Sequence, residues 1–277
     1  MKSTLINYQS QTSTQIYLNS GNADLLLNGT MKSNVVFVFQ APIILNKNAI
    51  EMKLSIVNAQ IPISWYLINS TNNKIYITVN GIKTVYYFPI GNYNVNTFIT
   101  QWLSAFGTNW TVTYNSITNK LTFNYISNFS LSDDTSSLFS IIGFVSGQTY
   151  ASSSNSLTSS NSINFYGLNR LQVKSSTFQL NNVDSFKKGI NRTLGIIPLT
   201  NVNGGICFYN NFTNYRNVFK NREISSIGIE FQDDYKNYID FSNVDWSLTL
   251  QIDILAEVVD DLNTLEDVYK NVAQELF

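Results

Sequence analysis

The 277-residue chain has no histidine and one cysteine, which excludes His-dependent catalytic triads, His-ligated metal sites, intrachain disulfides and Cys-rich zinc or iron–sulfur sites. Charged residues make up only 13%, about half the usual share, and the net charge of −1 excludes the strongly basic character of most nucleic-acid-binding proteins. No run of ~18 apolar residues exists, so the sequence predicts no membrane span.

The chain begins with a polar segment that leads into two strands. Residues 1–33 are rich in Ser, Thr, Asn and Gln, and we expect an N-terminal arm or a weak edge strand there. β-branched and aromatic residues at 35–39 predict the first strand of the compact domain. Apolar and polar residues alternate from 50 to 63, which predicts a second strand, bent or bulged near Asn58.

A β-hairpin is the clearest local signal. Residues 74–79 alternate, Asn80-Gly81 follows, and residues 82–88 run back. Asn-Gly favours a two-residue type I′ turn, because both central residues of that turn need positive φ.

A short helix is predicted directly after the hairpin, over residues 94–106. Asn94 can cap its N-terminus and Gly107 can end it. Its aromatic residues recur at a spacing of four and so share one face, which we expect to cover the edge or the end of a sheet.

The middle of the chain predicts a second hairpin and then long connections. Residues 111–114 and 121–125 flank a five-residue turn region. Residues 148–162 are dominated by Ser, which indicates a mobile surface loop. The whole of 145–222 is longer than a simple connection and is interpreted as long loops or an insertion.

The last third predicts two good strands and a helix. Residues 224–231 and 246–255 alternate between apolar and polar side chains. From 256 to 277 the apolar residues recur every three or four positions with acidic residues between them, which predicts a C-terminal amphipathic helix. That helix could dock on its own subunit or on a neighbouring copy. The chain is therefore predicted to be an all-β protein with few helices.

Reactive groups are scarce. Cys207 lies among apolar and aromatic residues, so we interpret it as a buried strand thiol rather than a nucleophile. The acidic pairs Asp133-Asp134 and Asp233-Asp234 are interpreted as turn formers, with a low-affinity cation site as the alternative. We expect no catalytic residue, no metal site and no cofactor.

Aromatic residues reach 14%, and most should lie in the core. Those near strand ends are candidates for a protein interface, where Tyr and Trp give a large contact area: Trp65, Tyr66, Tyr86 and Tyr87. Scattered basic residues are interpreted as solvated loop charges, so no direct nucleic-acid site is expected: Lys187, Lys188, Arg192, Arg216, Lys220 and Arg222.

An ordered set of short motifs resembles one protein family. The motifs are Gln40-Ala41-Pro42-Ile43, Asn58-Ala59-Gln60-Ile61-Pro62-Ile63-Ser64-Trp65-Tyr66, Phe88-Pro89-Ile90-Gly91-Asn92-Tyr93-Asn94, Ile141-Ile142-Gly143-Phe144, Ile227-Gly228-Ile229-Glu230-Phe231-Gln232-Asp233 and Val244-Asp245-Trp246-Ser247-Leu248-Thr249-Leu250. In this order they resemble the penton, or minor capsid, proteins of virophages, polinton-like viruses and related large DNA viruses. The order is more specific than any single motif.

The resemblance implies a single antiparallel jelly-roll sandwich over residues 34–255, with 145–222 as elaborated loops or an insertion. It further implies a homopentamer at each vertex of an icosahedral double-stranded DNA virus capsid. A major capsid protein with a double jelly roll would be the partner. The virion would be the location, with synthesis and assembly in the host cytoplasm, and a host receptor is a further candidate partner.

Two other functions stay open from the sequence. The same aromatic richness fits a carbohydrate- or receptor-binding jelly-roll module. A β-fold glycoside hydrolase would need two carboxylates across a cleft, and Asp233 or Asp234 would be the residues to change.

Overall fold

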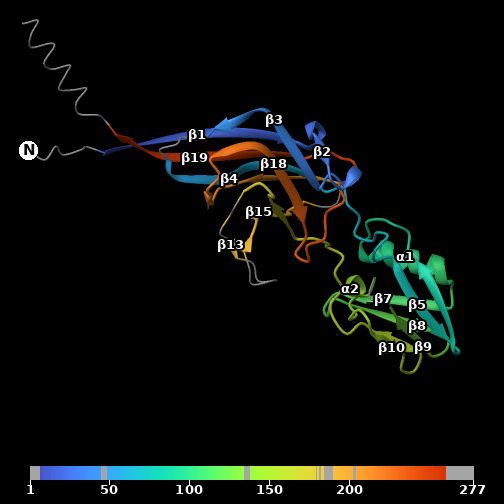
Figure 1. Ribbon diagram of the computed structural model, residues 1–277. Helices are drawn as coiled ribbons and strands as arrows, with labels where there is room; N and C mark the ends of the chain where they lie inside the picture. Colours follow the sequence, from blue (N-terminus) through green and yellow to red (C-terminus); the bar gives the residue numbers. More distant parts are fainter. Residues whose placement is uncertain are drawn as a thin grey trace, which may run out of the picture. The chain divides into compact units, whose positions relative to one another are not determined.

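The computed structural model describes residues 7–44, 49–133, 138–178, 180, 182–183, 190–201 and 204–259. The chain forms two compact units, each built from antiparallel strands (Figure 1). The first, called the jelly-roll unit, takes the chain up to Ser64 and again from Arg170. The second, called the insertion unit, is Trp65–Asn169.

The main strands of the jelly-roll unit come from both ends of the chain. They are β1 (Asn7–Asn19), β3 (Asn34–Ile44), β4 (Ala49–Pro62), β12 (Arg170–Lys174), β15 (Thr193–Pro198), β16 (Ile206–Asn210), β18 (Glu223–Gln232) and β19 (Ser247–Val259). Shorter pieces are η1 (Ser20–Asn22), β2 (Leu25–Leu26), η2 (Gly29–Met31), β13 (Asn182–Val183), β14 (Ile190–Asn191) and β17 (Asn217–Val218).

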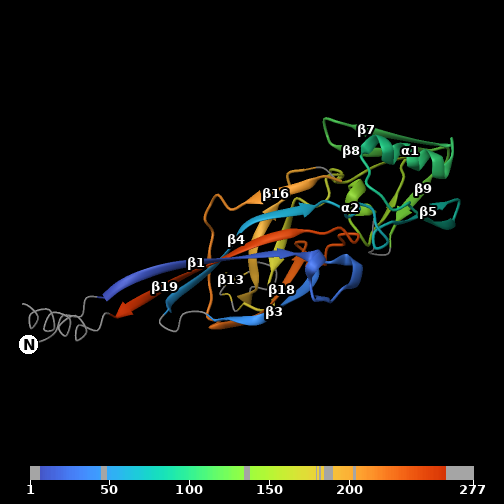
Figure 2. The ribbon, with the colours of Figure 1, turned by 90° about the horizontal axis from the view of Figure 1, so that it is seen from above.

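The strand order confirms the predicted jelly roll. One sheet runs β1-β19-β4-β16, with β17 also on β4, and the other runs β15-β12-β18-β3-β2 (Figure 2). Of the eight main strands, the first pairs with the last, the second with the seventh, the third with the sixth and the fourth with the fifth. This nested antiparallel pairing is a long hairpin rolled into two facing sheets.

Alternation places the apolar side chains between the two sheets. On β4 and β19 the inward residues Leu54, Leu250 and Ile252 are fully buried. Trp246 packs edge-on against Phe231 of the opposite sheet, with ring centroids 4.7 Å apart. The register of β4 with β19 shifts between Thr249 and Leu250, next to the position where the sequence predicts a bulge.

The insertion unit lies between the third and fourth jelly-roll strands in the chain. Its elements are β5 (Lys74–Val79), β6 (Ile82–Tyr87), α1 (Val95–Phe106), β7 (Trp110–Asn115), β8 (Lys120–Tyr125), β9 (Phe129–Ser132), α2 (Phe139–Ile142), β10 (Thr149–Ala151) and β11 (Ser156–Thr158). They form one sheet in the order β10-β9-β5-β6 and another in the order β11-β8-β7.

The local predictions for this unit are confirmed. Asn80 and Gly81 take φ values of 49° and 78°, as a type I′ turn requires. The side chain of Asn94 accepts a hydrogen bond from the backbone of Thr97, and the Thr97 hydroxyl accepts one from the backbone of Asn94, so a capping box starts α1. The two strands of the second predicted hairpin are β7 and β8.

An aromatic core fills the insertion unit. The helix α1 turns Phe98 and Trp102 into it, and both side chains are fully buried. Trp102 contacts Phe123 of β8 with ring centroids 4.6 Å apart and Trp110 of β7 at 5.5 Å. The helix therefore packs on the β11-β8-β7 sheet, as its apolar spacing predicts. No helix in the described ranges is both long enough and apolar enough to cross a bilayer.

The predicted arm and the predicted C-terminal helix need correction. The polar start of the chain is an integral strand, since β1 pairs with β19 along its whole length. Its polarity misleads because, among the described side chains of residues 11–19, Ile16 and Leu18 are the two that are buried, and all others but Tyr17 are polar. At the other end β19 continues to Val259, so 256–259 are strand, and the rest of the predicted helix lies outside the described residues.

The predicted insertion boundaries are also corrected. The inserted unit is Trp65–Asn169, whereas 170–222 supplies the jelly-roll strands β12, β15 and β16. The Ser-rich segment 148–162 is not a plain loop, because it contains β10 and β11. Serine hydroxyls serve as local hydrogen-bond partners there: Ser152 Oγ accepts from the backbone of Phe129 and Ser159 Oγ donates to a carbonyl.

Candidate interface surfaces

The four predicted interface residues all lie in the insertion unit, and only two of them offer surface. Trp65 is buried, and Tyr86 is half-buried with its ring 4.7 Å from that of Phe106. Tyr66 and Tyr87 are about half exposed, at 47% and 55%. A role for these two in an interface stays a prediction.

Tyr87 belongs to a lysine-and-tyrosine face that the sequence reasoning missed. The face is on the sheet that contains β5 and β6. Lys83 Nζ lies 4.3 Å from the ring centroid of Tyr76, and Lys74 Nζ lies 5.9 Å from that of Tyr87. The alternation along the hairpin could have predicted this face, because Lys74 and Tyr76 point to the side opposite the buried Ile75.

A surface of exposed apolar side chains lies at one edge of the jelly-roll unit. We call it the β16 flank, and its members are Ile196, Ile206, Phe208, Phe212 and Tyr215. Phe208 is 65% exposed and Phe212 is 91% exposed. Between the outward residues of β16, Cys207 turns inward and its Sγ donates to the carbonyl of Pro198 at 3.3 Å, which ties β16 to β15. The predicted buried strand thiol is confirmed.

The backbone of β16 also faces outward at this flank. Ile63 donates to the carbonyl of Gly205, and Asn211 donates to the carbonyl of Val57. Because hydrogen-bonding direction alternates along an antiparallel strand, the peptide groups of Phe208 point away from β4. This edge of the sheet therefore presents an aromatic side chain together with main-chain hydrogen-bonding groups.

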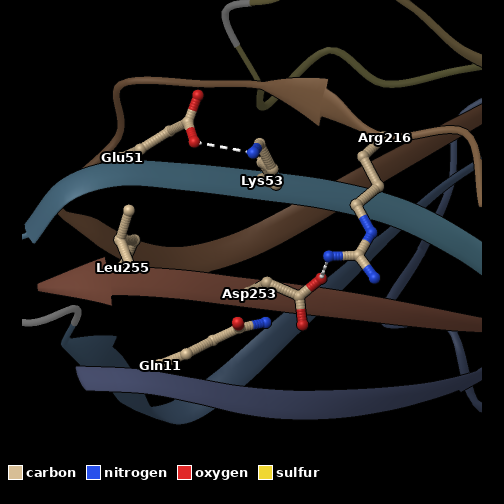
Figure 3. A pocket seen from close by; sticks show the side chains of 6 residues that line it. All are labelled: Gln11, Glu51, Lys53, Arg216, Asp253 and Leu255. Atoms are coloured by element: carbon tan, nitrogen blue, oxygen red, sulfur yellow. Dashed lines mark ion pairs between the residues drawn. The ribbon is translucent and has the colours of Figure 1, made fainter. Parts of the chain in front are cut away.

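An ion pair between a half-buried arginine and a buried carboxylate anchors the segment that follows β16. Arg216 Nη1 lies 2.8 Å from Asp253 Oδ2 on β19, beside the pair formed by Lys53 and Glu51 at 2.7 Å (Figure 3). Asp253 Oδ1 accepts from Ser13 Oγ of β1 at 2.5 Å. The two ion pairs, together with Gln11 and Leu255, line a small pocket of about 100 Å³. Since both cations are paired within the pocket, we interpret it as a structural tie and not as a ligand site.

A second apolar surface lies at the opposite edge of the jelly-roll unit. We call it the β1 flank, and its members are Tyr17, Leu25, Leu26, Leu27 and Val38. Tyr17 is 75% exposed on the outer face of β1. In the other sheet β2 covers the start of β3, where the backbone of Asp24 donates to Val36 and that of Leu27 donates to Asn34.

Hydrogen bonds hold the two sheets together at the β1 flank. The indole Nε1 of Trp246 donates to the carbonyl of Lys32 at 2.8 Å. Lys32 Nζ in turn lies 2.6 Å from Asp245 Oδ1, which also accepts from Ser20 Oγ at 3.0 Å. The hydrogen bond from Lys32 lowers the pKa of Asp245 below its ordinary value, and partial burial opposes this shift.

We expect this contact to make the jelly-roll unit less stable in acid. A lowered folded-state pKa contributes stability that is complete above the unfolded-state pKa and is lost as the pH falls through the folded value. The variant Asp245→Asn should therefore be less stable than the wild type at neutral pH. The difference should shrink as the pH falls below the unfolded-state pKa of the carboxyl and vanish once the pH lies below the folded-state pKa. Urea unfolding at a series of pH values measures it, and a difference that is constant with pH would contradict the assignment.

In the jelly-roll unit the edge strands are uncharged, whereas most of the inner strands carry charged residues. Among the described strands of the jelly-roll unit, the edge strands β1, β2, β15, β16 and β17 contain no charged residue. The inner strands β4, β12, β18 and β19 each contain at least two, and the inner strand β3 contains none. Proteins that stay monomeric usually protect their sheet edges with charges, prolines or bulges. Of the longer edge strands of this unit, β15 contains Pro198, whereas β1 and β16 contain neither a charge nor a proline.

The acidic pairs behave as turn formers where the structure describes them. Asp233 Oδ1 accepts from the backbone of Tyr235 and of Asn237, both at 2.8 Å. Asp234 pairs with Arg170 at 3.0 Å. Asp134 lies outside the described residues, as do Lys187 and Lys188. Within the described chain, no group of three or more His, Cys, Asp or Glu side chains could hold a metal ion.

No protein-family model matches the chain, and no curated protein matches it. Among solved structures, the crystal structure of SeMet-labelled mavirus penton protein is similar, with a TM-score of 0.47 and 11% sequence identity. The similarity covers 89% of this chain and 100% of the mavirus chain.

Proposed function

We propose that the chain is a structural subunit of an icosahedral double-stranded DNA virus capsid and forms the homopentameric vertex, the penton. A fold alone does not define a function, so the charge pattern carries this proposal. A complete jelly roll whose edge strands are all uncharged is suited to lateral packing in a shell. The ordered sequence motifs that resemble penton proteins support the same function.

The proposal includes the partners and the location that the resemblance implies. The ring of subunits would contact a double jelly-roll major capsid protein in the virion, after assembly in the host cytoplasm. The insertion unit is then the natural candidate for contact with a host receptor, because its lysine-and-tyrosine face is polar, aromatic and rigidly held on a sheet.

Mass and particle measurements test the proposed function. We expect the purified protein, alone or expressed with the major capsid protein, to give a species of five times the 31.3 kDa chain mass. A reconstruction of assembled particles should locate it at the five-fold vertices. A position away from those vertices would overturn the proposal. Binding on a glycan array by a protein that forms no five-fold species would instead favour a carbohydrate- or receptor-binding module.

A further inference from the structure

We infer that the lysine-and-tyrosine face of the insertion unit binds an acidic glycan, which is an oligosaccharide that carries a carboxylate. The inference rests on the proposed function and deepens it, because it names the chemical class of the receptor that this unit would contact. Two observations carry it. The strand register brings a lysine, an aliphatic side chain and a tyrosine into one row on the face, and the four strands of this sheet carry positive charge only.

Side-chain alternation and the strand register define the face. Ile75 and Ile77 of β5 point into the core, so their neighbours in the strand point outward, together with the residues paired with those neighbours on β6. On the two strands the outward residues are Lys74, Tyr76, Thr78, Lys83, Val85 and Tyr87. On the other side of β5, Ser130 of β9 lies beside Thr78. The face therefore combines ammonium, phenol, hydroxyl and aliphatic groups.

The row along β6 fits a sugar ring with an acidic substituent. Lys83, Val85 and Tyr87 are alternate residues of the strand, so each lies roughly 7 Å from the next. Val85 is 41% exposed and Tyr87 is 55% exposed, and together they form a platform for the C–H face of a pyranose ring. Lys83 begins the row, and Thr78 directly opposite it adds a hydroxyl that can bond to a sugar hydroxyl.

The charge of the face selects an acidic ligand. Lys83 Nζ lies 4.3 Å from the ring centroid of Tyr76, which holds the ammonium over the face. None of the ion pairs in the described part of the chain involves Lys83. The strands β5, β6, β9 and β10 contain two lysines and no acidic residue. A carboxylate at Lys83 therefore gains a charge-assisted hydrogen bond without displacing an internal partner.

The small number of charges separates this ligand from other anions. Nucleic acids and similar polyanions are bound by many cations at once, whereas this face offers two lysines. An acidic peptide has the same charge as an acidic glycan, but it would add to the edge of β6 through main-chain hydrogen bonds and would not need the ring of Tyr87. The exposed ring beside the lysines favours the glycan, and the dependence of binding on that ring distinguishes the two.

Calorimetric titration of the full chain with 3′-sialyllactose and with lactose tests the inference. The two sugars share a neutral disaccharide and differ in the unit that carries the carboxylate. A hyaluronan tetrasaccharide, whose carboxylates belong to uronic acids, is the second acidic probe. We expect an acidic probe to bind about tenfold more tightly than lactose. Lys83→Gln should remove this difference, whereas Lys83→Arg should keep most of it because arginine retains the charge.

A change of the ring and two matched controls complete the experiment. Tyr87→Ala should weaken binding of the acidic probe about tenfold, because the stacking platform is lost. Lys120→Gln on β8 and Tyr166→Ala, at a side chain that is 84% exposed, change the same residue types outside this sheet and should leave binding unchanged. Since Lys83 and Tyr87 are both exposed, urea unfolding should change little in their variants.

The failure of this inference is distinguishable from the failure of the proposed function. If neither acidic probe binds at millimolar concentration, or if lactose binds equally well, the glycan assignment is overturned and the capsid function stands. Binding of a hexaglutamate peptide that survives Tyr87→Ala, without binding of the acidic sugars, would assign the face to an acidic peptide and also overturn it. Particles whose vertices lack the chain overturn the capsid function, and the sugar titrations do not depend on that result.

Discussion

We expect Trp102→Ala to lower the free energy of unfolding of the insertion unit by about 3–5 kcal/mol. The indole is fully buried, and its ring centroid lies 4.6 Å from that of Phe123 and 4.7 Å from that of Phe106. Truncation would leave a cavity between α1 and the β11-β8-β7 sheet that the surrounding rings cannot fill without leaving their own contacts.

Hydrogen exchange followed by mass spectrometry measures this effect separately in the two units. We expect protection to fall in β5, β8 and α1 while β4 and β19 keep theirs, because the two units have separate internal contacts. Trp102→Phe is the control. Within the described chain the indole Nε1 of Trp102 is buried without a hydrogen-bond partner, so this variant removes an unfavourable group together with some volume.

Trp246→Phe provides a matched comparison in the other unit. Its indole donates to the carbonyl of Lys32, which would lose its partner in a buried position. We therefore expect phenylalanine to be better tolerated at Trp102 than at Trp246. Equal losses of protection in both units after Trp102→Ala would show that the insertion unit does not unfold independently.

Arg216→Met should be the most damaging single substitution outside the core, with a loss of about 3 kcal/mol in the free energy of unfolding of the jelly-roll unit. The side chain of Asp253 is only 5% exposed, so removal of Arg216 leaves a buried carboxylate without its counter-charge. The neighbouring Lys53 lies opposite Asp253 in the strand register but is paired with Glu51.

A double variant separates the value of the ion pair from the cost of breaking it. Replacing a buried pair by apolar groups of similar size is often neutral, whereas removing one partner is costly. We therefore expect Arg216→Met combined with Asp253→Leu to recover most of the stability in urea unfolding. If the free energy of unfolding of the double variant falls by the sum of the two single losses, the two side chains act independently. The loss in Arg216→Met then does not come from the broken ion pair.

The Arg216 variant also tests what holds the segment after β16. Arg216 ties this segment to β19, and the segment carries the exposed side chains of Phe212 and Tyr215. We expect hydrogen exchange in this segment to become faster in Arg216→Met even under conditions where the jelly-roll unit stays folded.

Strong local patterns predicted their elements well. The hairpin at Asn80-Gly81 and the helix that begins at Asn94 depend on turn geometry and capping, which involve residues close in the chain. The alternation in β4 and β19 likewise identified the core of the sandwich. The weak patterns were less decisive: for the start of the chain they left an arm and a weak edge strand open, and β1 is an edge strand, whereas the Ser-rich β10 and β11 contradict the predicted loop. Pairing with a neighbouring strand decides the conformation of all three.

The candidate interface residues also show what local sequence patterns can and cannot predict. The sequence reasoning chose aromatic residues near strand ends. Trp65 is nevertheless buried and Tyr86 half-buried, because the burial of a side chain depends on which sheet covers it. Phe208 and Phe212 were not chosen, although both are more exposed than any of the four. Nothing local distinguishes an exposed phenylalanine at an edge from a buried one in a neighbouring strand.

By itself the sequence determined that this protein is a β sandwich without histidine, with one cysteine and few charges, because composition and alternation act residue by residue. Only the tertiary structure decided which strands are edges, since that depends on pairing between segments up to 252 positions apart, such as Asn7 with Val259. That placement decides what an uncharged strand means. At an edge, its main-chain hydrogen-bonding groups are open to another chain, whereas in the interior of a sheet they are already paired on both sides.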